Sequence, residues 1–578
     1  MNKPNSSRKS INELRSQRWF GTAGMRAFAH HQRMYQTGVR REDYADKPVI
    51  GIINTWSDLS TCHSHLRSRA RSVKDGVLEA GGFPVELPAL SLGEVMVKPT
   101  TMLYRNLLAM ETEELIRSHP LDAVVLMGGC DKTTPGLIMG ATSAGIPALY
   151  MPAGATLSTR WRGESIGTGT HTRSYWDQLR AGEISEEDWR ELESVSVRSS
   201  GTCNTMGTAS TMALLAEVLG WTLPGAATIP AVDSAHPRMA RAAGERAVSM
   251  AWEDWTPKRW LNASNFMNAI TLQLAIGGST NAVIHLIAMA GRAGIPLTLD
   301  NFADQAGKVP LIADLMPTGR YLMEDLYFAG GSRALFGELG DLLETGSLSV
   351  TGDTLKENIN GAKVWNHDVI RPLDRPVTDT PALAVLRGNL APHGAVIKPC
   401  AATHALLQHR ARAVVFENAA DMHERIDDPN LEVNAESILV LKNAGPVGAG
   451  MPEWGGLPIP QKLLRAGVRD MVRISDARMS GTHFGTCILH VAPEAAIGGN
   501  LALVENGDEI ELDVLAGRLE LLVDEATLAE RRKRWQRPDT IYKRGFGVLH
   551  VSHVNQAPQG CDFDFLAGAE PTPEPDIY

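Results

Sequence analysis

The chain has 578 residues, of which 43% are hydrophobic and 21% are charged, a composition typical of soluble globular domains and not of disordered or fibrous segments. Its 56 basic and 66 acidic residues give a net charge of -10 with no long basic run, so a nucleic-acid partner is not expected. The longest uncharged stretch, 133–159, contains three prolines and four glycines, and we interpret it as buried core and not as a membrane span.

Two further features indicate the compartment. The N-terminal 21 residues carry positive charge but no apolar run of the kind found in secretory signals, which predicts a cytoplasmic protein. Six cysteines, at positions 62, 130, 203, 400, 487 and 561, are too sparse for a disulfide scaffold. In a reducing compartment they are either buried thiols or ligands.

From residue 48 onward, short apolar runs alternate with helical stretches, a pattern typical of parallel βα units. Strands are predicted at Val49–Asn54, Pro84–Leu90, Ala123–Gly128 and Pro147–Met151. Helices are predicted between them, at Ser64–Ala80, Thr100–Ser118 and Thr134–Ala144. The predicted fold class is therefore α/β, with a doubly wound parallel sheet in the N-terminal part.

Chemically useful side chains follow the predicted strands. Ligands of open parallel sheets bind outside the carboxyl ends of the strands. Cys62 follows the first run, Glu94 the second, and the Cys-Asp-Lys sequence at 130–132 the third. Cys203 lies shortly before another predicted helix, where the helix dipole favours a thiolate. Thiol, carboxylate and amine groups are thus expected at one edge of the sheet.

The middle of the chain departs from this pattern. Residues 158–200 are polar and rich in arginine and tryptophan, and we expect them to leave the sheet as a lid or a subunit contact. Residues 264–294 are predicted to be helical.

A change of character follows three prolines between residues 372 and 381. We predict an α/β domain over 1–380 and a smaller, β-rich, barrel-like domain over 381–578, with Asn506-Gly507 as a hairpin turn. The last twenty or so residues, rich in proline and acid, are expected to be loosely ordered or used in oligomer contacts.

Six segments carry a family resemblance. They are GGCDKTTPG (128–136), GTCNTMGTAS (201–210), GGSTNAVIHL (277–286), LRGNLAPHGAVIK (386–398), GPVGAGMPE (445–453) and ISDARMSGTHFG (474–485). In this order they resemble the signature segments of the dihydroxy-acid dehydratase and 6-phosphogluconate dehydratase family, over roughly residues 48–550. The HTR sequence at 171–173 and the SLGE sequence at 91–94 look most like the sugar-acid branch, which includes L-arabinonate and D-xylonate dehydratases.

This resemblance implies a hydro-lyase that dehydrates an aldonate, such as a pentonate, to a 2-keto-3-deoxy acid. Cys62, Cys130 and Cys203 match the ligands of an iron–sulfur cluster, either [2Fe-2S] or [4Fe-4S], whose open iron acts as a Lewis acid on the substrate 3-hydroxyl. Residues that match the ligands of a Mg²⁺ ion are Glu94, Asp131, Glu453 and Lys132. Lys132 would bind as a carbamate, because an ammonium group cannot coordinate a cation.

The C-terminal domain would supply the proton acceptor. Ser480 matches the serine that removes the C2 proton, and Thr482 is placed to orient the substrate. Five histidines and three cations near the motifs are further candidates for substrate contacts: His63, His65, His171, His393, His483, Arg160, Arg162 and Lys398. Family members form homodimers or homotetramers, and the same is expected here.

Two other functions stay open at this point. One is the dihydroxy-acid dehydratase reaction of branched-chain amino-acid synthesis, which is the same chemistry on an apolar substrate. The other is a non-catalytic, metal-bound scaffold. Without the resemblance, the three cysteines would be interpreted as buried thiols, and Lys132 as a salt-bridge partner of Asp131.

Overall fold

The computed structural model describes residues 8–568 and 570–577. A first sheet contains four parallel strands in the order β2-β1-β3-β4. Their bounds are β1 (Val49–Asn54), β2 (Phe83–Pro88), β3 (Ala123–Gly128) and β4 (Ala148–Pro152). The four predicted strands are confirmed, with the second shifted toward the N-terminus by one residue at its start and two at its end.

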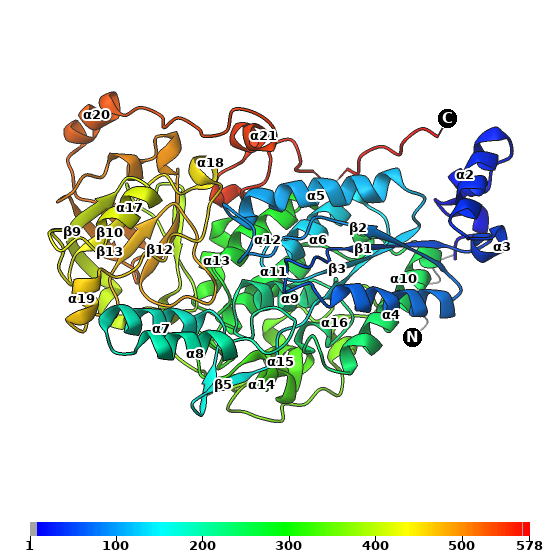
Figure 1. Cartoon of the computed structure of the whole chain (residues 1–578), viewed down its shortest axis with the longest axis horizontal. Coiled ribbons are helices and arrows are strands. Elements are labelled where there is room, and N and C mark those ends of the chain that lie inside the picture. The colour runs from blue at the N-terminus through cyan, green and yellow to red at the C-terminus, as the bar shows by residue number, and fades with distance from the viewer. Residues whose placement is uncertain (1–7, 569, 578) are drawn as a thin grey trace.

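Helices cover both faces of this sheet, which confirms the doubly wound α/β fold. Figure 1 shows α5 (Thr101–Ser118) above the strands and α4 (Leu66–Glu79) below them. Helix α6 (Thr133–Ala144) packs against α5, and α10 (Ala235–Glu253) packs against α4. A β-carbon at Gly76 of α4 would collide with the carbonyl oxygen of Arg241 in α10, so the two helices can approach this closely only with glycine there.

A buried helical layer lies between this sheet and the rest of the molecule. It consists of α9 (Thr208–Val218), α11 (Ala263–Ala275) and α12 (Asn281–Arg292), which are buried over almost their whole length. The helical prediction over 264–294 is confirmed, but the chain breaks at Ile276–Thr280 into two helices. Shorter helices follow: α13 (Leu299–Ala306), α14 (Met323–Phe328), α15 (Gly331–Leu339) and α16 (Leu355–Ile359).

The polar segment 158–200 leaves the sheet, as predicted. It forms a two-stranded ribbon, β5 (Thr159–Trp161) with β6 (Glu164–Ile166), and the helices α7 (Thr170–Ala181) and α8 (Glu186–Val195). Helix α7 contacts the C-terminal part of the chain, where Arg180 Nη2 donates a hydrogen bond of 2.8 Å to the carbonyl oxygen of Ile459. This segment therefore links the two halves of the molecule (Figure 1).

The second sheet has eight strands in the order β14-β13-β9-β10-β11-β12-β8-β7. Their bounds are β7 (Ala384–Leu386), β8 (Gly394–Ile397), β9 (Gln408–Phe416), β10 (Ile438–Leu441), β11 (Arg473–Ser475), β12 (Cys487–Ala492), β13 (Glu509–Asp513) and β14 (Arg518–Leu521). The backbone of Arg387 joins the two edge strands, β7 and β14. Its N–H donates to the carbonyl oxygen of Gly517, and its carbonyl oxygen accepts from the N–H of Leu519, at 2.8 Å each. The sheet is therefore a nearly closed barrel, which confirms the predicted β-rich architecture.

The hairpin predicted at Asn506-Gly507 is wrong. This turn precedes β13, which pairs with β9 on one side and β14 on the other, and the β13–β14 hairpin turns after Asp513 instead. Asn506 Oδ1 accepts the backbone N–H of Val415 at 2.7 Å, and the N–H of Gly507 donates to Ala413 O at 2.9 Å. The turn residues thus end the pairing with β9 and do not connect two strands of one hairpin.

The remaining helices lie at the ends of the chain and around the barrel. They are α1 (Gln17–Phe20), α2 (Met25–Gln36), α3 (Arg41–Tyr44), α17 (Ala419–Arg425), α18 (Pro446–Ala449), α19 (Gln461–Arg465), α20 (Glu525–Arg534) and α21 (Phe546–His553). The C-terminal tail runs back toward the N-terminal helices (Figure 1). Glu574 pairs there with Arg15 and Arg18, each at 2.6 Å. None of the described helices is long and apolar enough to cross a membrane.

Candidate functional site

A cavity of about 340 Å³ opens where the strands of the first sheet end. Its wall contains side chains that follow β1, β2 and β3 and others from the C-terminal part of the chain. The lining residues that the sequence had singled out are Cys62, Glu94, Cys130, Asp131, Cys203, Glu453, Ser480 and Thr482. The cavity is large enough for a small polyol. Lys132 is fully buried directly behind this wall.

The three cysteines of the motifs share this cavity. The thiols of Cys62 and Cys130 are hydrogen-bonded to each other, which together with burial raises the pKa of Cys62 well above its usual value. Burial, followed by the charge of Asp131, raises the pKa of Cys203 to about 12. Cys203 lies five residues before the start of α9 and not in its first turn, and burial favours the neutral thiol there.

These thiols fit a cationic iron–sulfur group. Cys130 has a positive φ of 66°, an uncommon conformation for a residue other than glycine, and follows β3 by two residues. Three thiols line one cavity wall, and burial disfavours the thiolate forms of Cys62 and Cys203. A positively charged iron group would stabilise such a donor set.

Three carboxylates form a second donor set. Oxygen atoms of Glu94, Asp131 and Glu453 all lie within 4.8 Å of one another. Hard oxygen ligands in such a group fit Mg²⁺. The Nζ atom of Lys132 lies 3.3 Å from both Glu94 and Asp131 and 3.9 Å from Glu453. The sequence therefore placed this lysine correctly beside the acids, and as an unmodified ammonium it forms ion pairs with them.

Arg478 holds the carboxylates in place, a role the sequence did not reveal. Its side chain is fully buried, and it donates to Glu453 Oε1 at 2.6 Å and to Glu94 Oε1 at 2.8 Å. Burial alone would raise the pKa of Glu94, but the charges of Arg478 and Lys132 outweigh it and lower the pKa to about 2. The only signal in the sequence is that Arg478 lies two residues before Ser480 in the same motif.

Ser480 and Thr482 lie on the loop after β11. The Ser480 and Thr482 hydroxyl oxygens are 2.9 Å apart, and the Thr482 carbonyl accepts a hydrogen bond of 2.8 Å from Thr170. Asn281 of α12 donates to the carbonyl oxygen of Met479 at 3.0 Å. The loop is thus fixed by both halves of the molecule, and its two hydroxyl groups face the cavity.

The histidine candidates do not line the cavity. His63 and His65 are hydrogen-bonded to backbone carbonyls at 2.8 and 2.7 Å, and burial lowers the pKa of each to about 4. His171 accepts the backbone N–H of Gly167, His483 is half-buried beside Gly456, and His393 is exposed elsewhere. These histidines are structural, apart from the exposed one.

The three cation candidates also lie outside the cavity wall. Arg160 is exposed, Arg162 pairs with Glu191 and Asp188, and Lys398 is buried elsewhere in the chain. The cation that does line the wall is Arg173, in the HTR sequence of α7.

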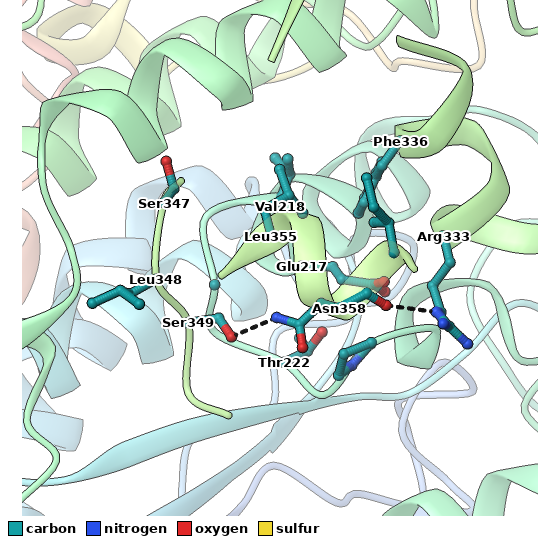
Figure 2. Close-up of a pocket in the computed structure, with 13 residues that line it drawn as sticks. Glu217, Val218, Thr222, Arg333, Phe336, Ser347, Leu348, Ser349, Leu355 and Asn358 are labelled. Carbon is teal, nitrogen blue, oxygen red and sulfur yellow. Dashed lines mark hydrogen bonds between the residues drawn. The ribbon is translucent and has the colours of Figure 1, made fainter. Parts of the chain in front are cut away.

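A second cavity, shown in Figure 2, is lined by residues of α9, α15 and α16. Its volume is about 20 Å³, room for little more than one water molecule. The polar side chains around it bond to one another, as Asn358 does to Ser349 at 3.0 Å. This cavity has no room for a sugar acid.

Comparison with known proteins agrees with the motifs. The chain matches the family models described as dihydroxy-acid/6-phosphogluconate dehydratase N-terminal over residues 47–358 and C-terminal over residues 368–561. It is 56% identical to a 6-deoxy-6-sulfo-D-gluconate dehydratase of Pseudomonas putida, over 99% of both chains. It is 48% identical to an L-arabinonate dehydratase of Rhizobium leguminosarum bv. trifolii, over 96% of both chains, and 39% identical to a D-xylonate dehydratase of Caulobacter vibrioides, over 91% of both.

Proposed function

The chain belongs to the dihydroxy-acid and 6-phosphogluconate dehydratase family and is a hydro-lyase, and we propose that it converts an aldonate to a 2-keto-3-deoxy acid. The observation that carries this proposal is the cavity wall. Ten of its residues are serines or threonines, beside the three thiols and three carboxylates: Ser60, Thr61, Thr156, Thr168, Thr172, Ser196, Thr202, Thr208, Ser480 and Thr482. Hydroxyl groups both donate and accept hydrogen bonds, as recognition of a polyol requires.

The donor sets support the proposed cofactors. Cys62, Cys130 and Cys203 would hold an iron–sulfur cluster, [2Fe-2S] or [4Fe-4S], and Glu94, Asp131, Glu453 and a carbamylated Lys132 would hold Mg²⁺. When bound, the cluster supplies a Lewis acid for departure of the 3-hydroxyl, and Mg²⁺ supplies positive charge at the substrate carboxylate and 2-hydroxyl.

The chain's own residues perform the proton transfer. Once its own hydroxyl proton has passed to water, Ser480 Oγ accepts the C2 proton and becomes a neutral hydroxyl, and the hydroxyl of Thr482, 2.9 Å away, donates a hydrogen bond that stabilises the negative oxygen before the transfer. As the C2–H bond breaks, its electron pair forms the C2–C3 double bond and the 3-hydroxyl leaves with its own electron pair. The departed hydroxide takes up a proton to become water, and the enol releases its 2-hydroxyl proton and takes a proton at C3 to give the 2-keto-3-deoxy acid. Arg478 acts through Glu94 and Glu453 by fixing where they point.

A substrate panel tests the proposal. Formation of 2-keto acid would be measured with L-arabinonate, D-xylonate, D-galactonate, D-gluconate and 2,3-dihydroxyisovalerate. We expect turnover of one or more sugar acids, with the pentonates L-arabinonate and D-xylonate as first candidates. Turnover of 2,3-dihydroxyisovalerate alone would contradict the sugar-acid assignment. Iron, sulfide and zinc analysis after anaerobic purification completes the test, since zinc without sulfide would favour the scaffold.

We also propose that the enzyme is a cytoplasmic homodimer or homotetramer. The exposed apolar side chains Met25, Phe28 and Tyr35 on α2 support self-association. Light scattering coupled to size exclusion would measure the molar mass, and a monomer at micromolar concentration would contradict the proposal.

A further inference from the structure

Lys398 is a buried lysine that the fold leaves without a partner. Only 3% of the residue is exposed. Among the described residues, none forms a hydrogen bond or an ion pair with its Nζ atom. An amine that has lost its water and gained no hydrogen bond carries a cost in free energy. Burial therefore lowers the pKa of Lys398, which increases the fraction of neutral amine, and a neutral amine is a nucleophile.

Cys400, two residues further on, is a thiol that the proposed mechanism does not use. It does not line the cavity, and it is half-buried, whereas Cys487 and Cys561 are buried. A small oxidant from solvent is therefore expected to reach Cys400 before these two. The Cys400 sulfur contacts Thr318 Oγ1 and the carbonyl oxygen of Ala382, each at 3.8 Å. These contacts are long, and they leave the sulfur free to react.

The two side chains act on each other electrostatically. The charge of Cys400 raises the pKa of Lys398 against the larger effect of burial. In turn, burial raises the pKa of Cys400, and the charge of Lys398 is the largest effect that opposes it. Each group is therefore the main electrostatic partner of the other.

The backbone holds the two residues close together. Lys398 follows β8 directly, and Pro399 begins a short 3-10 helix that ends at Ala401. The N–H of Ala401 donates to the carbonyl oxygen of Lys398 at 3.1 Å, which closes the turn. Two residues of chain span at most about 7 Å, and the four methylene groups of a lysine side chain can cover that distance.

Both side chains also lie on the same side of the strand. Along β8, Ala395 and Ile397 belong to the core of the barrel, whereas Val396 belongs to the core that lies mainly in the N-terminal part of the chain. Side chains of a strand alternate between its two faces, so Lys398 continues the face of Val396. Cys400 packs against the same N-terminal core. The amine and the thiol are thus directed to one region.

We propose that Lys398 and Cys400 form an oxidative modification site, in which a peroxide oxidises the Cys400 sulfur and the Lys398 nitrogen then bonds to it. In the first step the thiol sulfur attacks one peroxide oxygen, the O–O bond breaks, and a sulfenic acid and water form. In the second step the amine lone pair attacks the sulfur, the S–OH bond breaks, and the leaving hydroxide takes a proton from nitrogen. Sulfur is oxidised by two electrons, one hydrogen peroxide becomes two waters, and a sulfur–nitrogen bond remains.

The unmatched amine favours this reaction. The bond converts a buried amine, which has no partner and prefers to be charged in water, into an uncharged link. The cost of burying the amine therefore disappears in the oxidised chain.

The test is peptide mapping of the holoenzyme after treatment with hydrogen peroxide. Trypsin does not cleave before proline, so Lys398 and Cys400 remain in one peptide, Gly388–Arg410. Free thiols are blocked with N-ethylmaleimide before digestion. The treated proteins are the wild type, Lys398→Met, Cys400→Ser and the control Lys442→Met. Lys442 is also buried, but its Nζ atom bonds to Glu417 Oε1 at 2.9 Å.

In the wild type and in Lys442→Met, we expect part of this peptide to be about 2 Da lighter than its reduced form, the mass of two hydrogen atoms, and to resist N-ethylmaleimide. Fragmentation should give no break between residues 398 and 400, and dithiothreitol should restore the original mass. In Lys398→Met the sulfur has no amine to meet, so Cys400 should instead reach the sulfinic acid, about 32 Da heavier. Cys400→Ser should show neither change.

A second measurement tests the unmatched amine itself and does not depend on oxidation. Methionine has nearly the length of lysine but no amine, so the midpoint of urea unfolding should rise in Lys398→Met. It should not rise in Lys442→Met, because that amine has a partner. A midpoint that falls in Lys398→Met by as much as in Lys442→Met would show that Lys398 is matched after all, and would overturn the inference.

Four mapping results would also overturn it. One is a wild-type peptide that stays unchanged after the cavity cysteines have been oxidised. Another is a sulfinic acid at Cys400 beside a free Lys398. A 2 Da loss of the same extent in Lys398→Met would place the bond at a backbone nitrogen. A peptide about 14 Da heavier would place an oxygen atom between nitrogen and sulfur, which contradicts the direct bond. None of these results bears on the dehydration of a sugar acid, so the proposed function is tested separately.

Discussion

Replacing Arg478 by glutamine should destabilise the folded protein, because Glu94 and Glu453 would lose a buried ion-pair partner. Arg478 is fully buried and pairs with Glu453 at 2.6 Å and Glu94 at 2.8 Å, and it also donates to Met451 O and Thr100 Oγ1, each at 2.8 Å. Removing one partner of a buried ion pair costs about 3–5 kcal/mol. Because Lys132 still faces both glutamates, we expect the lower part of this range, about 3 kcal/mol.

The assay is urea unfolding of EDTA-treated protein, followed by tryptophan fluorescence and circular dichroism. Arg478→Gln is compared with the wild type and, as a control, in a chain where Glu94 and Glu453 are both glutamine. In that background Arg478 is itself an unpaired buried cation, so its removal should be neutral or stabilising.

The difference between the two backgrounds isolates the interaction of Arg478 with the glutamates. An equal loss of stability in both would show that Arg478 acts through packing or through Met451 and Thr100, and the account given above for the low pKa of Glu94 would be wrong.

Three further predictions concern the donor sets and the fold. Cys130→Ser should lose iron and sulfide, measured chemically after anaerobic purification, whereas Cys400→Ser, outside the cavity wall, should retain both; wild-type iron content in Cys130→Ser would contradict the ligand assignment. Ser480→Ala should keep the iron but stop exchange of the substrate C2 proton with deuterium, and normal exchange would reject Ser480 as the proton acceptor. Burial, followed by the charge of Glu494, raises the pKa of Asp476 from 3.8 to about 7, so the folded chain binds this proton more tightly than the unfolded chain and loses the corresponding stability as pH rises from 3.8 to about 7. In EDTA-treated protein, the thermal unfolding midpoint of Asp476→Asn should therefore fall less between pH 5 and pH 8 than that of the wild type. An equal fall in both proteins would show that another group causes it.

Much of the fold follows from the sequence because its strands are short apolar runs with clear ends. β1 and β3 are buried at every position, which is what a central parallel strand requires, and both were predicted residue for residue. The hairpin at Asn506-Gly507 failed because a local turn signal does not say which strand the following residues will pair with. β13 pairs with β9, about a hundred residues earlier in the chain, and only the closed barrel decides that.

The candidate site shows the same limit. The cysteines, acids and Ser480 were predicted because the resemblance to the family implies them, and the structure brings them to one cavity wall. Arg478 stands in the same motif as Ser480, but its importance arises from a contact with Glu94, 384 residues away in sequence. A contact over that distance leaves no local trace in the sequence. His63 and His65 were predicted as candidate substrate contacts because they lie near the motifs, but they are hydrogen-bonded to backbone carbonyls and do not line the cavity.

The charges around Lys132 explain how one pocket can be stable both without and with a divalent cation. Three carboxylates face Lys132 and Arg478, which leaves one net negative charge. An ammonium 3.3 Å from two of the acids repels a metal ion. The proposed carbamate replaces that positive charge with a negative one and adds an oxygen donor, and a bound Mg²⁺ then returns the group to one net negative charge. Arg478 is positive in both states, so it can hold Glu94 and Glu453 in the same positions before and after the exchange, and the proposed Mg²⁺ would require no rearrangement of the site.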